Sequence, residues 1–184
     1  YQYCDWRALS KAVVACFLQS ELPIGYGVGH GWRPISKPYV VTKVKENRLY
    51  EVDGKPAIEM YKEFFGKKAK KIIEEPLGKL ALQCPIGMPT TFGNYILRHP
   101  FAVEKDGSII MSGDIPEQAV IRIMTAEPKD NIKAAYEAAI QAKKMLGKAK
   151  PAMALIIDCG ARYLLRGKKV ADEEIKAVKK VLGN

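Results

Sequence analysis

Short apolar runs separated by turn residues fill the middle of the chain and predict strands. Residues 39–44 and 48–52 are β-rich runs joined by polar Lys45-Glu46-Asn47, a pattern typical of a β-hairpin. Four further runs are separated by segments rich in glycine, proline and aspartate, and they lie at 95–98, 101–104, 108–111 and 120–125. This regular spacing predicts an antiparallel meander.

Helical periodicity is clearest in the segment that begins at Pro128 and ends before Gly147. Ile132, Tyr136 and Ile140 recur there every fourth residue, so they share one face of a helix. Further helices are predicted at three places, namely residues 57–65, 161–166 and 171–182.

Three other apolar runs also predict strands. Residues 12–18 would form a hairpin with residues 1–4, and a strand is expected near 80–84. Residues 152–157 are continuously apolar, which is typical of a central strand covered on both faces. The elements together predict an α+β or mixed α/β fold: a largely antiparallel sheet with helices packed on its faces, arranged as two associated sub-domains.

Glycine occupies every second position from Gly25 to Gly31. In an extended segment one face would therefore be bare backbone, and the other would carry Tyr26, Val28, His30 and Trp32. A bare face admits close approach. Two interpretations stay open: a ligand or second backbone packed on the glycines, or tight packing within a sheet.

The chain has 184 residues and a formal net charge of +10, of which residues 128–184 carry +7. This excess leaves open a basic interaction module for nucleic acid or an acidic partner. The lysines alternate with acids, however, and no basic run contains interleaved aromatics, so we expect solvated helix faces and no nucleic-acid binding. No apolar run approaches the roughly 20 residues of a membrane helix, and we expect a soluble, cytoplasmic protein.

The residues that most often carry catalysis or metal binding are few and scattered. Four cysteines have no metal-ligand spacing, and three of them are expected to be small buried hydrophobic residues. His30 and His99 are the only histidines. No phosphate-binding loop and no catalytic template occurs, so we expect no metal, no cofactor and no catalysis.

A series of short motifs follows one another along most of the chain. They are His30 to Ile35, Tyr50 to Ala57, Arg98-His99-Pro100, Asp106-Gly107-Ser108, Gly113 to Pro116 and Ile157 to Arg162. In this order they resemble the FIST (F-box and intracellular signal transduction) family. The resemblance implies that residues 1–38 are the end of the N-terminal FIST half. Residues 39–184 would be the C-terminal half without its last strand.

The resemblance also implies an intracellular sensor for small molecules, with amino-acid-like ligands among the possibilities. The signal would pass to a signalling partner or to an output module outside this chain. Ligands gather beyond the carboxyl ends of strands, where a following helix start attracts anions. The expected ligand-binding residues are Cys159, Gly160, Arg162, Arg98, His30, Trp32 and Arg33.

Two alternatives to a ligand sensor remain from the sequence. Cys159 could be a nucleophile, because a helix start and Arg162 would both favour its thiolate. The basic module described above is the second. We also expect the chain to begin inside one strand and to end before another. Unpaired strands invite a partner, so a homodimer is expected.

Overall fold

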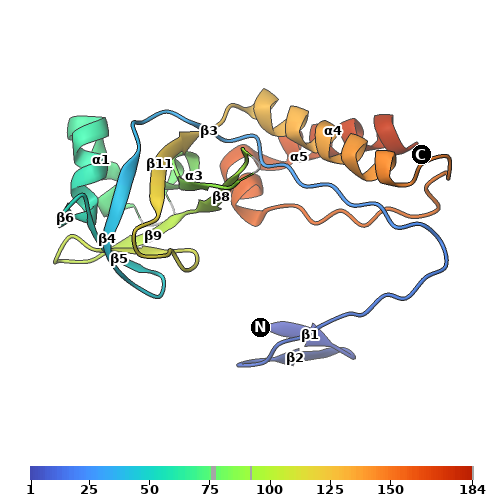
Figure 1. Ribbon diagram of the computed structural model, residues 1–184, viewed down its shortest axis with the longest axis horizontal. Coiled ribbons are helices and arrows are strands. Elements are labelled where there is room, and N and C mark those ends of the chain that lie inside the picture. The colour runs from blue at the N-terminus through green and yellow to red at the C-terminus, as the bar shows by residue number, and fades with distance from the viewer. Residues whose placement is uncertain (76–77, 92, 184) are drawn as a thin grey trace.

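The computed structural model describes residues 1–75, 78–91 and 93–183. A curled antiparallel sheet with short helices forms one end of the molecule, and two long helices form the other (Figure 1). A small hairpin of β1 (Gln2–Cys4) and β2 (Arg7–Leu9) lies away from both. The fold is therefore α+β with a largely antiparallel sheet, as the sequence predicts.

The strands of the main sheet are short and pair only antiparallel. They are β3 (Arg33–Pro34), β4 (Tyr39–Lys45), β5 (Arg48–Val52), β6 (Lys55–Pro56), β7 (Ile86–Pro89), β8 (Tyr95–Arg98), β9 (Pro100–Val103), β10 (Ile109–Met111) and β11 (Val120–Thr125). Their order is β8-β7-β11-β4-β5-β10-β9, with β3 added to β11 and β6 added to β5. His99 alone separates β8 from β9, although these strands lie at opposite ends of that order. The sheet must therefore curl into a nearly closed barrel.

The predicted β4–β5 hairpin is confirmed, and so are the strands at β8 and β11. The predicted meander is wrong. Although β9 pairs with its successor β10, β10 also joins β5 through Ile109 and Leu49, and β11 lies between β4 and β7. A meander assumes that successive strands are neighbours, whereas these runs are distributed around the curled sheet.

The helices are α1 (Ala57–Phe65), α2 (Lys70–Glu74), α3 (Lys79–Gln83), α4 (Pro128–Met145) and α5 (Gly160–Leu182), with a 3₁₀ turn at Gly66–Ala69. The predicted helix that begins at Pro128 is confirmed as α4. The side chains of Glu127 and Asp130 form a capping box at its start, which satisfies backbone N–H groups that a helix leaves unpaired.

Helix α5 contains a sharp kink at Gly167. This residue has φ 75° and ψ 176°, a conformation that is essentially restricted to glycine. The kink divides α5 into two helical parts, which agrees with the two helices predicted at 161–166 and 171–182. Helices α4 and α5 pack against each other (Figure 1).

The main core fills the space between the curled sheet and α1. Its completely buried side chains include Val41, Leu49, Tyr61, Ile86, Ile109 and Ile123. The Tyr61 hydroxyl donates a hydrogen bond to the Cys84 carbonyl at 3.0 Å, which satisfies its polar group inside the core. A smaller core of Trp32, Met124 and Ala126 lies where the barrel meets the helix pair.

Three predicted strands are wrong. Residues 80–84 lie mostly in α3, because a short apolar run suits a buried helix as well as a strand. Residues 152–157 are extended but pair with no strand in the described chain, and all of them are exposed. Residues 12–18 are likewise outside any strand, since β1 pairs with β2 instead.

The cysteine prediction is also wrong. Cys84 is buried, and burial raises the pKa of its thiol to about 11. The thiols of the other three cysteines, Cys4, Cys16 and Cys159, are free and belong to exposed residues.

Candidate functional site

The glycine-rich segment lies directly against the backbone of α4. A Cβ added at Gly25, Gly27 or Gly29 would lie 2.0, 1.9 or 2.7 Å from the carbonyl oxygens of Ala142, Ala138 and Ala134 respectively. Two extended residues advance about 6.7 Å and four helical residues about 6 Å, so the two repeats stay in step. The second backbone that the glycine pattern allowed is therefore a helix, and the packing is not that of a sheet.

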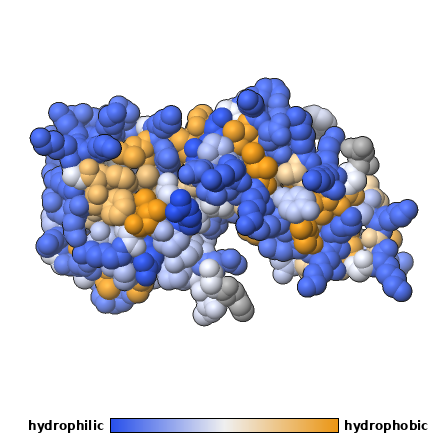
Figure 2. Space-filling model, turned by 90° about the horizontal axis from the view of Figure 1, so that it is seen from above, coloured by the Kyte–Doolittle hydropathy of each residue, from blue (hydrophilic) through white to orange (hydrophobic). Residues whose placement is uncertain are grey.

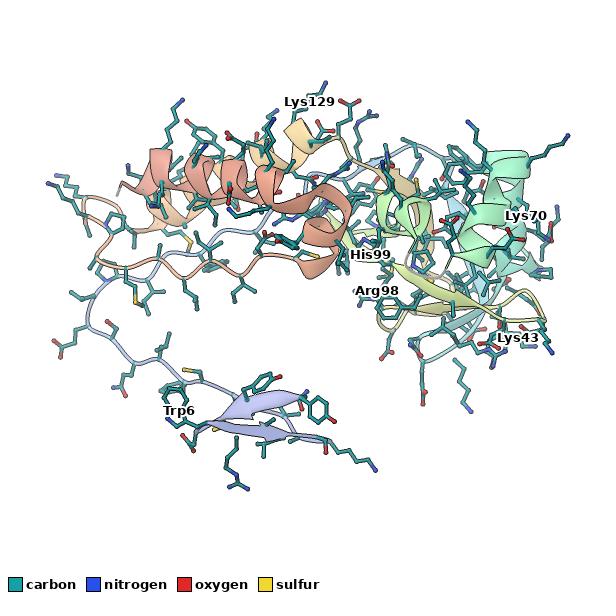
Figure 3. The ribbon with its side chains drawn as sticks, turned by 180° about the vertical axis from the view of Figure 1, so that it is seen from behind. Trp6, Lys43, Lys70, Arg98, His99 and Lys129 are labelled. Atoms are coloured by element: carbon teal, nitrogen blue, oxygen red, sulfur yellow. The ribbon has the colours of Figure 1, made fainter. Side chains whose placement is uncertain are left out.

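The glycine-rich segment leads into a group of polar and aromatic side chains between the barrel and the helix pair. We call this group the junction cluster, and it consists of His30, Trp32, His99, Asn131, Arg162, Arg166 and Glu174. Ring contacts, hydrogen bonds and charges connect its members. Figure 3 shows His99 on the barrel, in the region that faces the first turns of α5.

His30 is held in one neutral form by two backbone groups. Its Nε2 lies 3.0 Å from the Tyr95 carbonyl oxygen, and its Nδ1 accepts a hydrogen bond from the Trp32 N–H at 2.9 Å. Nε2 must therefore carry the proton. Burial lowers the pKa of His30, and the positive charge of Arg162 lowers it further.

Trp32 is buried, and its indole N–H donates a hydrogen bond to the Gln83 carbonyl of α3 at 3.1 Å. The ring of His99 meets Trp32 edge to face, with 6.1 Å between centroids. Trp32 therefore joins the glycine-rich segment to the barrel.

Asn131 ties the glycine-rich segment to both long helices. It is fully buried, and its Nδ2 donates to the His30 carbonyl oxygen at 2.8 Å. Its Oδ1 accepts a hydrogen bond from Arg166 Nε at 3.3 Å, and Arg166 also donates to the Ala126 carbonyl. One side chain of α4 thus connects the segment before β3 with α5.

Arg162 carries the most unusual contacts of the cluster. Its Nη2 lies 2.5 Å from Asp158 Oδ1 and 3.2 Å from Glu174 Oε2, and its side chain is only 11% exposed. Its Nε and Nη1 are buried and have no hydrogen-bond partner among the described residues. Because these two N–H groups point to different sides of the guanidinium, each is available for a separate charge-assisted hydrogen bond to a carboxylate oxygen.

The kink at Gly167 makes the contact between Arg162 and Glu174 possible. Twelve residues separate the two, which would place them about 18 Å apart along a straight helix. Instead the two parts of α5 fold toward each other at Gly167. Burial raises the pKa of Glu174, and Arg162 opposes that rise. The ion pair is therefore built by the kink.

The predicted site residues fall into three sets. His30, Trp32 and Arg162 come together in the junction cluster. Cys159 and Gly160 begin α5 beside it, with the Cys159 N–H bonded to Asp158 Oδ1 at 2.7 Å. The remaining two make no described hydrogen bond to the cluster: Arg98 donates to the carbonyls of Asp114 and Leu97, and Arg33 is exposed on β3.

Asn131, Arg166 and Glu174 were not among the residues that the sequence predicts for the site. All three lie on amphipathic helices. The only trace of them in the sequence is a polar residue at a position on the buried face of each helix.

Other surface features give weaker support for a functional site than the junction cluster does. A hollow of about 480 Å³ lies over α1 and β4, but its lysines and acids pair with each other, as in Lys37 with Glu63 at 2.8 Å and Lys62 with Glu59 at 2.8 Å. Within the described residues, no three His, Cys, Asp or Glu side chains converge on a metal position. No described helix is both long and apolar enough to cross a membrane.

Comparison with known families identifies the chain. The FIST C domain matches residues 57–184, and the FIST N domain matches residues 1–55. The chain belongs to the FIST family. FIST domains are sensory domains of signal transduction.

One curated relative of this FIST chain comes from Methanocaldococcus jannaschii and is itself uncharacterized. It is 28% identical over 147 residues, which cover 75% of the chain and 28% of the relative. The chain thus spans less than a third of the length of the curated relative it matches. No solved structure matches it.

The protonation of His99 gives a testable property of the junction cluster. Burial lowers its pKa, and no described residue forms a hydrogen bond with its buried Nε2. The unfolded chain therefore binds a proton near pH 6.5 that the folded chain binds only at lower pH, so stability falls as pH falls below about 6.5. We expect His99→Phe to lose less stability than the wild type between pH 7.5 and 5.5. For each pH unit, the free energy of unfolding lost by the two proteins should differ by at most about 1.4 kcal/mol.

Urea unfolding at several pH values measures this difference. His30 is present in both proteins, so the comparison isolates His99. Parallel pH profiles of the two proteins would contradict the assignment.

Proposed function

We propose that this FIST chain is a sensory domain that binds a small carboxylate, such as an amino acid, at the start of α5. The observation that carries the proposal is the buried Arg162 guanidinium, whose Nε and Nη1 have no partner in the part of the chain that the structure describes. Leaving such groups unpaired costs about 1 to 3 kcal/mol each, and more when the group is charged, so a bound carboxylate would stabilise the fold.

The surroundings of Arg162 support an anionic ligand. Within the described chain, no side chain caps the N-terminus of α5, so the backbone N–H groups of its first turn are available beside Arg162. Cys159 and Gly160 are exposed at this turn, while Leu165 of the same helix packs against the Trp32 core. Any response to the ligand would pass to a partner or to another part of a longer protein.

Catalysis by Cys159 receives less support. Both nitrogens of His30 are engaged, by the Tyr95 carbonyl and the Trp32 N–H. Among the described hydrogen bonds, none joins a histidine nitrogen to the Cys159 thiol, so no histidine is placed to take its proton. The contacts favour binding over nucleophilic chemistry.

Thermal unfolding in the presence of amino acids and small dicarboxylates tests the proposal. A ligand at about 100 times its Kd adds about 2.7 kcal/mol, which corresponds to a rise in Tm of about 5 to 10 °C for a chain of this size. The methyl ester of the same ligand should give no rise, because it lacks the negative charge that the guanidinium and the helix start favour.

Two variants locate the site. Arg162→Lys keeps the positive charge but replaces the Nε–H and Nη1–H donors by one flexible ammonium group, so the ligand-induced rise should disappear. Arg7→Lys on the exposed β2 is the matched control and should keep the full rise. The proposal is wrong if no carboxylate raises Tm, or if both variants respond equally.

A further inference from the structure

A large apolar surface lies under the helix pair. Two extended segments form it, residues 25–29 along α4 and residues 151–159 before α5, and both run beneath the helix pair on the side of the β1–β2 hairpin (Figure 1). We call this surface the open face. Its exposed apolar side chains are Tyr26, Val28, Met153, Leu155, Ile156 and Ile157, which are 43 to 87% exposed.

The opposite side of the helix pair has the composition of an ordinary surface. Charged pairs such as Lys133 with Glu137 and Lys168 with Asp172 cover it, and Figure 2 shows it as largely hydrophilic, with hydrophobic side chains visible between the charges. The apolar character therefore belongs to the extended segments.

The area of the open face exceeds what a monomer usually exposes. A single apolar patch on a monomer rarely exceeds a few hundred Å², and one partner of a stable complex buries about 800 Å², so six exposed apolar side chains on two adjacent segments are typical of an interface. Part of the backbone of this surface also lacks partners within the described chain. In the described chain, residues 151–158 make no backbone hydrogen bond to another segment. Their N–H and C=O groups are available to a strand.

The β1–β2 hairpin supplies the complementary element. It consists of three pairs of opposed residues, Gln2 with Leu9, Tyr3 with Ala8 and Cys4 with Arg7. Tyr1, Tyr3 and Trp6 are 75 to 107% exposed, so the hairpin does not pack on its own chain. A hairpin of this size is marginally stable alone and needs a surface to cover.

We infer that the open face is the interface of a symmetric homodimer. The hairpin and the segment after it, residues 1–24 of one copy, cover residues 151–157 of the second copy, and the reverse contact forms by two-fold symmetry. Each copy supplies both an apolar strand edge and the element that covers it, which is what a closed, self-complementary interface requires.

Light scattering of the intact chain at about 1 to 100 μM tests the inference, because the fraction of dimer rises with protein concentration. We expect twice the chain mass of 20.5 kDa. Leu155→Lys should weaken dimerisation at least about 100-fold, because two-fold symmetry counts the loss of each buried leucine twice. Val28→Lys and Tyr3→Lys should act in the same direction from the other segment and from the hairpin.

Ile96→Lys is the matched control, because Ile96 is 48% exposed on β8 and lies outside the open face. It should leave the dimer unchanged. Hydrogen exchange at residues 151–157 should be slow in the wild type and fast in Leu155→Lys. The inference is wrong if the chain is monomeric at 100 μM, if Leu155→Lys remains a dimer, or if it and Ile96→Lys weaken the dimer equally.

Discussion

Replacing Gly27 by alanine should remove about 3 kcal/mol or more of folding stability. The new Cβ would lie 1.9 Å from the Ala138 carbonyl oxygen and 2.7 Å from its carbon, so it meets helix backbone and not a movable side chain. Overpacking in a close-packed interior costs about 1 to 3 kcal/mol even where side chains can shift, and more where they cannot. The glycine-rich segment must then lift from α4, which also strains the contacts of His30.

Urea unfolding of Gly27→Ala against Gly160→Ala measures this effect. A Cβ at Gly160 would meet no atom within 4 Å, and alanine is favoured over glycine in a helix by up to about 1 kcal/mol. The control should therefore be neutral or slightly more stable. Equal stability of the two variants would show that the glycine-rich segment does not lie against α4.

Replacing Asn131 by alanine should cost about 3 kcal/mol. The change removes the partner of the His30 carbonyl and of the Arg166 Nε–H, and each buried group left unsatisfied costs about 1 to 3 kcal/mol. The cavity adds to that cost. Asn131 has no exposed surface, so water reaches the vacated groups poorly.

Asn94→Ala is the control for this second variant, because Asn94 is exposed and its side chain makes no described hydrogen bond. Its stability should stay within about 0.5 kcal/mol of the wild type. If Asn131→Ala unfolds at the same urea concentration as the control, the junction cluster does not hold the helix pair to the barrel.

Local chemistry made part of the fold predictable. The β4–β5 hairpin follows from two β-rich runs and a three-residue polar connection, and α4 follows from its four-residue repeat and its proline start. Residues 152–157 were misassigned for a different reason. Their apolar side chains indicate what the segment needs, namely a covered position, but a strand also requires a neighbouring strand, which the described chain does not supply.

The candidate site was predictable to the same extent. His30 and Trp32 stand out because the glycines isolate them, and Arg162 stands out at a helix start. Asn131 and Glu174 could not be found in this way. Asn131 meets His30 across 101 residues of sequence, and Glu174 reaches Arg162 only because Gly167 bends α5. Contacts made by a kink or by distant packing leave no local pattern.

The packing of the glycine-rich segment on α4 also sets the order in which the nascent chain can complete its fold. The Val28 N–H meets Gln141 across 113 residues, and the glycine contacts also join residues about 100 or more positions apart. At about 5 to 20 residues per second, a ribosome needs roughly 6 to 23 s to make the helix that covers this segment. Throughout that interval the glycine-rich segment is uncovered, which is when a chaperone would have most to bind.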